Sequence, residues 1–310
     1  MSARDVNARV KHNGTRKGAV APAETAAPAE TAAPAETVAP AETAAPAETA
    51  APAAPAETAA PAPAVAARVV PAESVAAAPV FRTLSVIVPV YNERNTVAEI
   101  LRRIRAVDLP LQLEVVVVDD GSTDGTDKVL SALQDSTVRV VTHKDNRGKG
   151  AAVRTGVATA RGELVLIQDA DLEYDPDDWP RLLDPVLKGK AEVVYGSRFT
   201  GERRAMRPTQ WLGNRLLTLT ANVLYRSTLS DMETCYKLFD RRVLDGITIE
   251  SDGFDFEPEI TAKVLRRGHR IYEVPVSYTG RDPSEGTKFA WRDGVHALTT
   301  LVRYRLVRRV

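Results

Sequence analysis

Cysteine is nearly missing from this sequence: Cys235 is the single one among 310 residues. An intramolecular disulfide and a multi-cysteine zinc site are therefore excluded. No apolar run approaches the length of a membrane-spanning helix, and the charged N-terminus lacks the apolar core of a signal peptide. We therefore expect a reduced, cytoplasmic protein whose contact with a membrane is peripheral.

An excess of charge of one sign is also missing, because 41 Lys and Arg residues balance 41 Asp and Glu residues. Residues 1–80 hold six basic and eight acidic residues, which leaves 35 basic and 33 acidic residues in the remainder. A protein that binds nucleic acid needs a basic field to hold the phosphate backbone. The charge balance therefore argues against nucleic acid as a partner.

Aromatic residues are absent from residues 1–80, where the hexapeptide Pro-Ala-Glu-Thr-Ala-Ala recurs with prolines at positions 22, 28, 34, 40, 46 and 52. Such a segment buries too little apolar surface to offset the entropy of ordering it, and its prolines interrupt any alanine helix. We expect residues 1–80 to be a disordered tail that serves as a spacer or linker. Residues 81–310 then form one folded domain.

After position 80 the pattern changes to short apolar runs rich in β-branched residues, separated by segments with helical spacing. Such runs are typical of strands buried on both faces of a parallel sheet. Ile271–Tyr278 has the pattern of an edge strand, because Pro275 cannot donate to a ladder. We predict an α/β fold with a doubly wound, largely parallel sheet, with strands at Leu84–Val90, Leu113–Val118, Val138–Thr142, Glu163–Gln168 and Val193–Tyr195, and helices at Trp211–Tyr225 and Phe256–Arg267.

Polar clusters follow the first four of these predicted strands. In doubly wound sheets the ligand binds beyond the carboxyl ends of the strands. We therefore expect the four clusters to converge on one crevice. They are Tyr91–Glu93, Asp119–Thr126, Asn146–Gly150 and Asp169–Asp171.

The last cluster, Asp169-Ala170-Asp171, places two carboxylates where a buried strand ends. Neighbouring anions of this kind suit Mg²⁺ or Mn²⁺, which usually keep waters and bridge substrate phosphates. The alternative interpretation is local, because Asp and Asn are common at turns and helix caps. By that interpretation Asn92 caps a helix and Asp119–Gly125 forms a turn. The tripeptide predicts a metal only in combination with the other clusters.

Several phosphate-binding signatures are missing. The sequence has no Gly-x4-Gly-Lys-Ser/Thr loop, and Gly148-Lys149-Gly150 is not a full dinucleotide fingerprint and follows the third strand. A glycine-rich loop after the first strand, expected of a sugar-nucleotide-forming nucleotidyltransferase, is replaced by Pro89-Val90-Tyr91-Asn92-Glu93. These absences argue against kinases, Rossmann oxidoreductases and nucleotidyltransferases.

The ordered set of motifs resembles family-2 glycosyltransferases of the GT-A fold. Its members here are Val-Pro-Val-Tyr-Asn-Glu, Val-Asp-Asp-Gly-Ser-Thr-Asp-Gly-Thr, Asn-Arg-Gly-Lys-Gly-Ala-Ala and Asp-Ala-Asp. Gly196–Arg198, Asp231–Phe239 and the segment from Arg281 to Lys288 resemble later motifs of the polyprenyl (dolichyl) phosphate mannosyl- or glucosyltransferases. The resemblance covers Leu84 to Tyr304 and implies a nucleotide-sugar site at the carboxyl ends of the strands.

The resemblance also implies roles for individual residues. It assigns Asp171 to the metal, Mg²⁺ or Mn²⁺, with Glu173 as a second metal-side ligand. It assigns Arg198, Arg281 and Lys288 to phosphates of donor or acceptor, and Arg215 is a further candidate. Solvated surface cations are the alternative for these basic residues. The residues assigned to the nucleotide are Pro89, Tyr91, Glu93, Val118, Asp120, Asp169 and Ala170.

The activity implied is transfer of a hexose, mannose or glucose, from GDP-mannose or UDP-glucose to polyprenyl phosphate. The acceptor phosphate attacks the anomeric carbon in line with inversion, while the metal and basic residues stabilise the departing nucleoside diphosphate. Asp171, Arg198 and Arg281 are the residues expected to carry catalysis. In some relatives the Arg–Lys spacing of the last motif is one residue shorter, which puts the Lys288 contact in doubt.

Two other functions stay open. A family-2 transferase with a soluble or glycan hydroxyl acceptor needs Asp231 or Glu233, which lie near Lys237, as general base. A non-enzymatic sugar-nucleotide-binding or scaffold protein would use the tail to recruit a partner. Cys235 is interpreted as a buried thiol rather than a nucleophile. His143, His269 and His296 share no ligand spacing and are assigned to no metal.

The segment 291–310 mixes apolar residues with five arginines. It suits either an anionic membrane surface, with snorkelling arginines, or ordinary packing as an amphipathic helix. Many relatives continue into membrane spans at this point or use a membrane partner. We therefore expect a protein held peripherally at the inner face of the cell membrane, on its surface or by a membrane-embedded partner.

Overall fold

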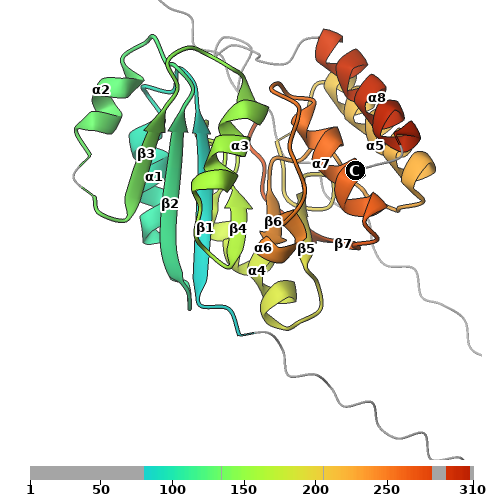
Figure 1. The fold of residues 1–310 in the computed structure, drawn as a ribbon, viewed down its shortest axis with the longest axis horizontal. Coiled ribbons are helices and arrows are strands. Elements are labelled where there is room, and N and C mark those ends of the chain that lie inside the picture. Colours follow the sequence, from blue (N-terminus) through green and yellow to red (C-terminus); the bar gives the residue numbers. More distant parts are fainter. Residues whose placement is uncertain (1–79, 134, 205, 281–290, 308–310) are drawn as a thin grey trace, which may run out of the picture. The chain divides into compact units, whose positions relative to one another are not determined.

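One sheet with the strand order β3-β2-β1-β4-β6-β5-β7 organises the part of the chain that we describe (Figure 1). The structure is a computed structural model, and it describes residues 80–133, 135–204, 206–280 and 291–307. The expected disordered tail lies outside these residues, apart from position 80. The expected boundary at residue 81 is therefore still a prediction.

The first four strands are parallel neighbours in the order β3-β2-β1-β4. Val86 of β1 lies opposite Val115 of β2 on one side and Leu166 of β4 on the other, and all three side chains are fully buried. Burial on both faces is the reason why these strands read as continuous apolar runs. The predicted parallel sheet is confirmed, with β1 at Thr83–Val90, β2 at Gln112–Asp119, β3 at Val138–Thr142 and β4 at Leu164–Ile167.

The C-terminal half adds three strands, one of them reversed. β6 (Lys237–Asp240) is antiparallel to both β4 and β5 (Val193–Ser197), whereas β7 (Ile271–Pro275) is parallel to β5. β7 is the edge strand that Pro275 predicted. The sequence did not predict β6, because its four residues show no alternation and lie within a motif interpreted by its chemistry.

Helices cover both faces of the sheet (Figure 1). α1 (Val97–Ala106) and α4 (Trp179–Leu187) pack on the face that holds Val86, while α3 (Lys149–Thr159) and α7 (Phe256–Arg266) pack on the face that holds Ile87. The two layers confirm the predicted doubly wound architecture. The remaining elements are α2 (Thr126–Ser131), the 3-10 turn η1 (Pro176–Asp178), α5 (Pro208–Tyr225), α6 (Arg241–Leu244) and α8 (Trp291–Leu306).

Close packing of α3 on β1 depends on Gly156. A methyl group placed on Gly156 would overlap Cγ2 of the fully buried Ile87. We expect Gly156→Ala to destabilise the domain by about 1–3 kcal/mol through overpacking, which exceeds the helix-propensity gain of up to about 1 kcal/mol. Gly213→Ala in α5, where a methyl group meets no atom within 4 Å, is the control and should stabilise. Urea unfolding measures both variants, and equal stabilities would contradict this packing.

Within the described residues, no helix has the length and apolar character that crossing a bilayer requires. The four parallel strands β1–β4 all end at the same edge of the sheet, because they run in one direction. The loops that follow them are therefore brought together, as the sequence predicted.

Candidate functional site

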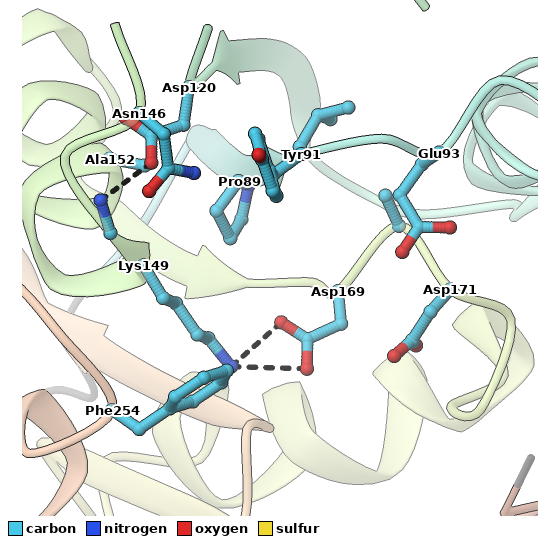
Figure 2. Close-up of a pocket in the computed structure, with 13 residues that line it drawn as sticks. Pro89, Tyr91, Glu93, Asp120, Asn146, Lys149, Ala152, Asp169, Asp171 and Phe254 are labelled. Atoms are coloured by element: carbon cyan, nitrogen blue, oxygen red, sulfur yellow. Dashed lines mark hydrogen bonds and ion pairs between the residues drawn. The ribbon is translucent and has the colours of Figure 1, made fainter. Parts of the chain in front are cut away.

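A cavity of about 330 Å³ lies at the carboxyl ends of β1, β2 and β4, beside the start of α3 (Figure 2). Seven residues that the sequence analysis assigned to the nucleotide or the metal line it: Pro89, Tyr91, Glu93, Asp120, Asp169, Ala170 and Asp171. Asn146, Lys149 and Phe254 also line the cavity, although the sequence analysis gave them no role. The cavity has the size of a small-molecule site.

The β1 loop is tied to the β2 loop by its own polar groups. Asn92, in a left-handed conformation (φ 55°), accepts the amide N–H of Thr123 through Oδ1 at 2.8 Å, and the amide of Glu93 donates to Thr126 Oγ1 at 3.0 Å. Thr96, not Asn92, lies at the N-cap of α1. These bonds hold Tyr91, which is 37% exposed, at the mouth of the cavity, where its ring can stack on a base.

The carboxylate of Asp120 forms hydrogen bonds with other groups of the protein. It accepts from His143 Nδ1 at 2.6 Å and from the amide N–H groups of Arg147 and Gly148 at 3.0 and 2.7 Å. The Nε2 atom of His143 lies 2.9 Å from Thr155 Oγ1. The carboxylate therefore holds the loop that begins α3 in addition to lining the cavity, so its predicted contact with the nucleotide remains a prediction.

Lys149 is the main site residue that the sequence analysis missed. Its Nζ atom lies 2.9 Å from Oδ1 of Asp169, a contact that Figure 2 shows. The same atom lies 2.9 Å from Sγ of Cys235 and 3.4 Å from the buried Glu257. Burial alone favours the neutral amine, but these groups, led by Asp169, hold the pKa of Lys149 well above its usual range. A fixed positive charge therefore lies on the wall of the cavity.

The end of β4, which precedes Asp169 and Asp171, is fixed by buried hydrogen bonds. Gln168 is fully buried at the end of β4, and its Oε1 accepts from Trp179 Nε1 at 3.0 Å and from the Tyr236 hydroxyl at 2.7 Å. Leu172 follows Asp171 with φ 64°, a rare conformation for a non-glycine residue. The backbone therefore turns sharply just after Asp171, from an anchored strand end.

The donor set at this turn fits a divalent cation. The carboxylates of Glu93, Asp169 and Asp171 lie around the same side of the cavity (Figure 2). In the described residues no group of three or more His, Cys, Asp or Glu side chains forms a metal cage. Mg²⁺ usually takes one or two carboxylates and completes its shell with waters and phosphates, so Asp171 with a diphosphate is a suitable set.

Four described residues of the prediction do not line the cavity: Val118, Glu173, Arg198 and Arg215. Glu173 accepts a hydrogen bond from the Tyr278 hydroxyl at 3.0 Å, and its role as a second metal-side ligand remains a prediction. Val118 is fully buried in β2 and packs with Ala152, which does line the cavity. Val118 therefore supports the cavity from behind.

Arg198 and Asp231 form a buried ion pair, and neither residue lines the cavity. The Nε atom and one terminal nitrogen of Arg198 donate to the two carboxylate oxygens at 2.8 Å each, and its guanidinium lies 5.4 Å from the ring centre of Tyr278. Burial opposes the charge, but Asp231 holds the pKa of Arg198 well above its usual range. Among the described residues, this side-chain pair uses two of the five N–H donors of the guanidinium, and the role of Arg198 at a phosphate remains a prediction.

Glu233 is a buried acid whose pKa is affected by its burial and by charges that include Arg198 and Asp231. Burial, with repulsion from Glu257, raises its pKa to about 7. Its Oε1 atom has no hydrogen-bond partner among the described residues. Lys237 is fully buried and bound to Glu257 at 2.5 Å and to the carbonyl of Met232 at 3.0 Å. Lys237 therefore balances the charge of Glu257 inside the protein.

The raised pKa of Glu233 makes stability depend on pH. The folded state holds the proton up to about pH 7, whereas the ordinary value is 4.5, so the contribution is complete below 4.5 and lost as pH rises to 7. We expect Glu233→Gln to flatten this slope, by on the order of 3 kcal/mol. Urea unfolding at pH 4.5 and 7 measures it, with the exposed Glu202→Gln as control. A slope unchanged by Glu233→Gln would contradict the assignment.

The other candidates are accounted for as follows. Cys235 is partly buried, and burial next to Asp169 raises the pKa of its thiol well above the usual range, which agrees with an unreactive thiol. Arg215 is exposed and donates to the carbonyl of Ser230 at 3.5 Å. His143 contacts Asp120 and Thr155, and His269 contacts Glu192 at 2.8 Å. Arg281 and Lys288 lie outside the described residues.

Comparison with known proteins places these observations in a family. Residues 85–248 match the Glycosyl transferase family 2 domain. Polyprenol monophosphomannose synthase from Mycolicibacterium smegmatis is 34% identical over 66% of this chain and 80% of the relative. Undecaprenyl-phosphate mannosyltransferase from Micrococcus luteus is 33% identical over 64% of this chain and 84% of the relative.

A longer relative matches over part of its length. The low-salt glycan biosynthesis hexosyltransferase Agl6 from Haloferax volcanii is 32% identical over 64% of this chain, and the match spans 48% of Agl6. Among solved structures, glucosyl-3-phosphoglycerate synthase from Mycobacterium tuberculosis, in complex with Mn²⁺, UDP and phosphoglyceric acid, superimposes with a TM-score of 0.58. It is 24% identical, and the match covers 73% of this chain and 79% of that protein, which shows a shared fold.

The predicted resemblance is therefore confirmed at two levels. The sheet order, the paired helical layers and the structural neighbour agree with a GT-A fold. The match over residues 85–248 covers more than half of the chain. The chain belongs to glycosyl transferase family 2.

Proposed function

We propose that this protein transfers a hexose, with mannose favoured over glucose, from a nucleoside diphosphate sugar to polyprenyl phosphate, with inversion at the anomeric carbon. One observation carries the proposal: the aspartates of the β4 turn line a cavity together with Tyr91 and Glu93 at the carboxyl ends of parallel strands. The preference for mannose rests on relatives named for mannose transfer to polyprenyl phosphates.

The donor side of the cavity supplies three kinds of contact. Tyr91 offers a ring for the base, and the carboxylates of Glu93 and Asp169 can accept from base N–H groups or ribose hydroxyls. Asp171 would hold Mg²⁺ or Mn²⁺, which when bound supplies positive charge for the departing diphosphate. Lys149 adds a fixed cation to the same wall. GDP-mannose and UDP-glucose both fit this description.

The acceptor side favours a phosphate over a hydroxyl. A polyprenyl phosphate is anionic near neutral pH and needs no general base, whereas a hydroxyl acceptor does. Asp231, one of two candidate bases, is fully buried and bound to Arg198. Arg198, with Arg281 and Lys288, would hold donor or acceptor phosphate.

A lipid-partition assay tests the proposal. The protein is incubated with Mn²⁺, polyprenyl phosphate and radiolabelled GDP-mannose or UDP-glucose, and the label is extracted into organic solvent. We expect label in the lipid fraction that is released by mild acid, as a glycosyl phosphodiester is. Label that stays with a water-soluble or acid-stable product would overturn the proposal.

Glu233 supports one second candidate, transfer to a soluble or glycan hydroxyl. Its Oε1 atom has no hydrogen-bond partner among the described residues, and a pKa of about 7 suits a general base. If Glu233 is the general base of hydroxyl transfer, Glu233→Gln should abolish turnover. Transfer to a phosphate needs no such base, so turnover should persist. Donor binding without turnover on any acceptor would favour the non-enzymatic alternative.

A further inference from the structure

α5 carries an apolar stripe on the side opposite the protein core. Its inward face buries Leu217 and Ala221. Its outward face exposes four large aliphatic residues that follow helical spacing and are 59–71% exposed: Leu212, Leu216, Leu219 and Val223. Large aliphatic side chains gathered on one helix face mark an interaction surface, unlike the single exposed ones scattered on any protein.

α8 repeats this arrangement beside α5. The two helices pack together through a shared cluster that includes Leu217 and Leu301, and the Tyr225 hydroxyl donates to the carbonyl of Leu301 at 2.6 Å (Figure 1). The outward residues of α8 recur with helical spacing and are 41–76% exposed: Val295, Leu298, Val302 and Leu306. Two neighbouring helices therefore each bury one apolar face and expose another.

The charges in the segments that carry these stripes are mostly positive. Residues 203–230, which contain α5, include five Arg and no Asp or Glu. Residues 294–310, which contain most of α8, include four Arg and no Asp or Glu. The chain as a whole is neutral, so the bias is local. Asp293 lies in the first turn of α8 and Glu250 pairs with Arg303 at 2.9 Å, but arginines are in excess beside both stripes. Aliphatic stripes with an excess of arginines at their borders complement a surface that is apolar inside and anionic at its border.

The stripe on α5 lies in the chain between Arg198, the residue that the proposed function assigns to a phosphate, and Asp231. The segment that forms α5 follows Arg198 and ends before Asp231, and the side chains of these two residues pair at 2.8 Å. Arg215 of α5 donates to the carbonyl of Ser230, next to Asp231. A bilayer against α5 would therefore contact the segment that joins Arg198 to Asp231.

We propose that the outward faces of α5 and α8 dock onto an anionic lipid bilayer, with the aliphatic residues in the interface and the flanking arginines at the phosphates. Arginine side chains suit this position because their stems lie along apolar surface while the guanidinium reaches the headgroups. The biological role of this docking rests on the proposed function, because docking would bring the site to an acceptor that is held in the membrane. Docking itself needs neither acceptor nor donor.

Vesicle flotation tests the docking face. The full-length protein is mixed with vesicles of phosphatidylcholine alone or with phosphatidylglycerol, in the absence of polyprenyl phosphate and donor. We expect binding to the anionic vesicles and at least about tenfold weaker binding for Leu216→Gln/Leu298→Gln. The control Val140→Gln/Tyr272→Gln changes two residues of β3 and β7 that are 39% and 45% exposed, and it should bind like the unchanged protein.

A charge variant separates electrostatic from apolar docking. Arg226 and Arg305 are exposed beside the stripes. We expect Arg226→Gln/Arg305→Gln to lower the preference for anionic over neutral vesicles and to reduce its salt dependence. Equal binding of all variants would overturn the proposal. A dimer in sedimentation that Leu216→Gln/Leu298→Gln abolishes would also overturn it, because a second copy would then cover the face.

Failure of docking can be told from failure of the proposed function. Transfer to polyprenyl phosphate in detergent does not require a bilayer. If transfer persists in detergent but the vesicles are not bound, the docking face alone is wrong. If the vesicles are bound but no hexose reaches polyprenyl phosphate, the proposed function is wrong.

Discussion

Asp171→Asn is expected to abolish metal-dependent transfer, by about a thousandfold or more, because the carboxylate proposed to hold the cation loses its charge. The amide keeps the shape of the side chain and can still accept the N–H of Glu173 through its oxygen, as Asp171 Oδ1 does at 3.2 Å. The sharp turn at Leu172 should therefore persist. The loss is expected in turnover and metal-dependent donor binding, with the fold retained.

Thermal shift with and without Mn²⁺, in the presence of donor, measures the binding part of this prediction. Unchanged protein should show a metal-dependent rise in melting temperature, and Asp171→Asn should not. Asp177→Asn is a matched control, because Asp177 is an exposed aspartate in the following turn η1. Full activity of Asp171→Asn would remove Asp171 from the metal site.

Arg198→Met is expected to lower both stability and transfer. Asp231 is fully buried, and removing its partner leaves an uncompensated charge, which should destabilise the domain by about 3–5 kcal/mol. Transfer should fall because the guanidinium proposed for the phosphate is gone. Urea unfolding and initial rates measure the two effects separately.

The double variant Arg198→Met/Asp231→Leu distinguishes a structural from a catalytic role. Replacing both members of a buried ion pair by apolar residues is often neutral for stability, so stability should return toward that of the unchanged protein. Transfer should not return, because the phosphate contact is still missing. If the double variant regained both, Arg198 would act only as the partner of Asp231.

Residues that act within one strand–loop unit could be predicted from the sequence. The strand ends at Val90, Asp119 and Ile167 follow apolar runs, and parallel pairing brings their loops to one edge. The placement of Tyr91, Glu93 and Asp171 around one cavity followed from that geometry. Local patterns therefore predicted which loops meet at the cavity, whereas the donor-binding roles of their residues came from the family resemblance and remain predictions.

Contacts between distant segments could not be predicted. Glu257 of α7 lies between Lys149 and Lys237, and nothing in its local sequence indicates two lysine partners from other elements. The engagement of Asp120 by His143, and of Glu173 by Tyr278, likewise depends on how loops meet in the folded chain. The reversed strand β6 was missed for a different reason, because its four residues are too few to show an alternating pattern.

The configuration and linkage of the product test the central claim most directly. Proton and phosphorus NMR of the purified lipid product shows whether the anomeric proton couples to phosphorus and which anomer is present. We predict a single hexose joined through its anomeric oxygen to the polyprenyl phosphate, with configuration inverted relative to the donor. Retained configuration, or an anomeric proton without coupling to phosphorus, would contradict direct in-line attack by the lipid phosphate.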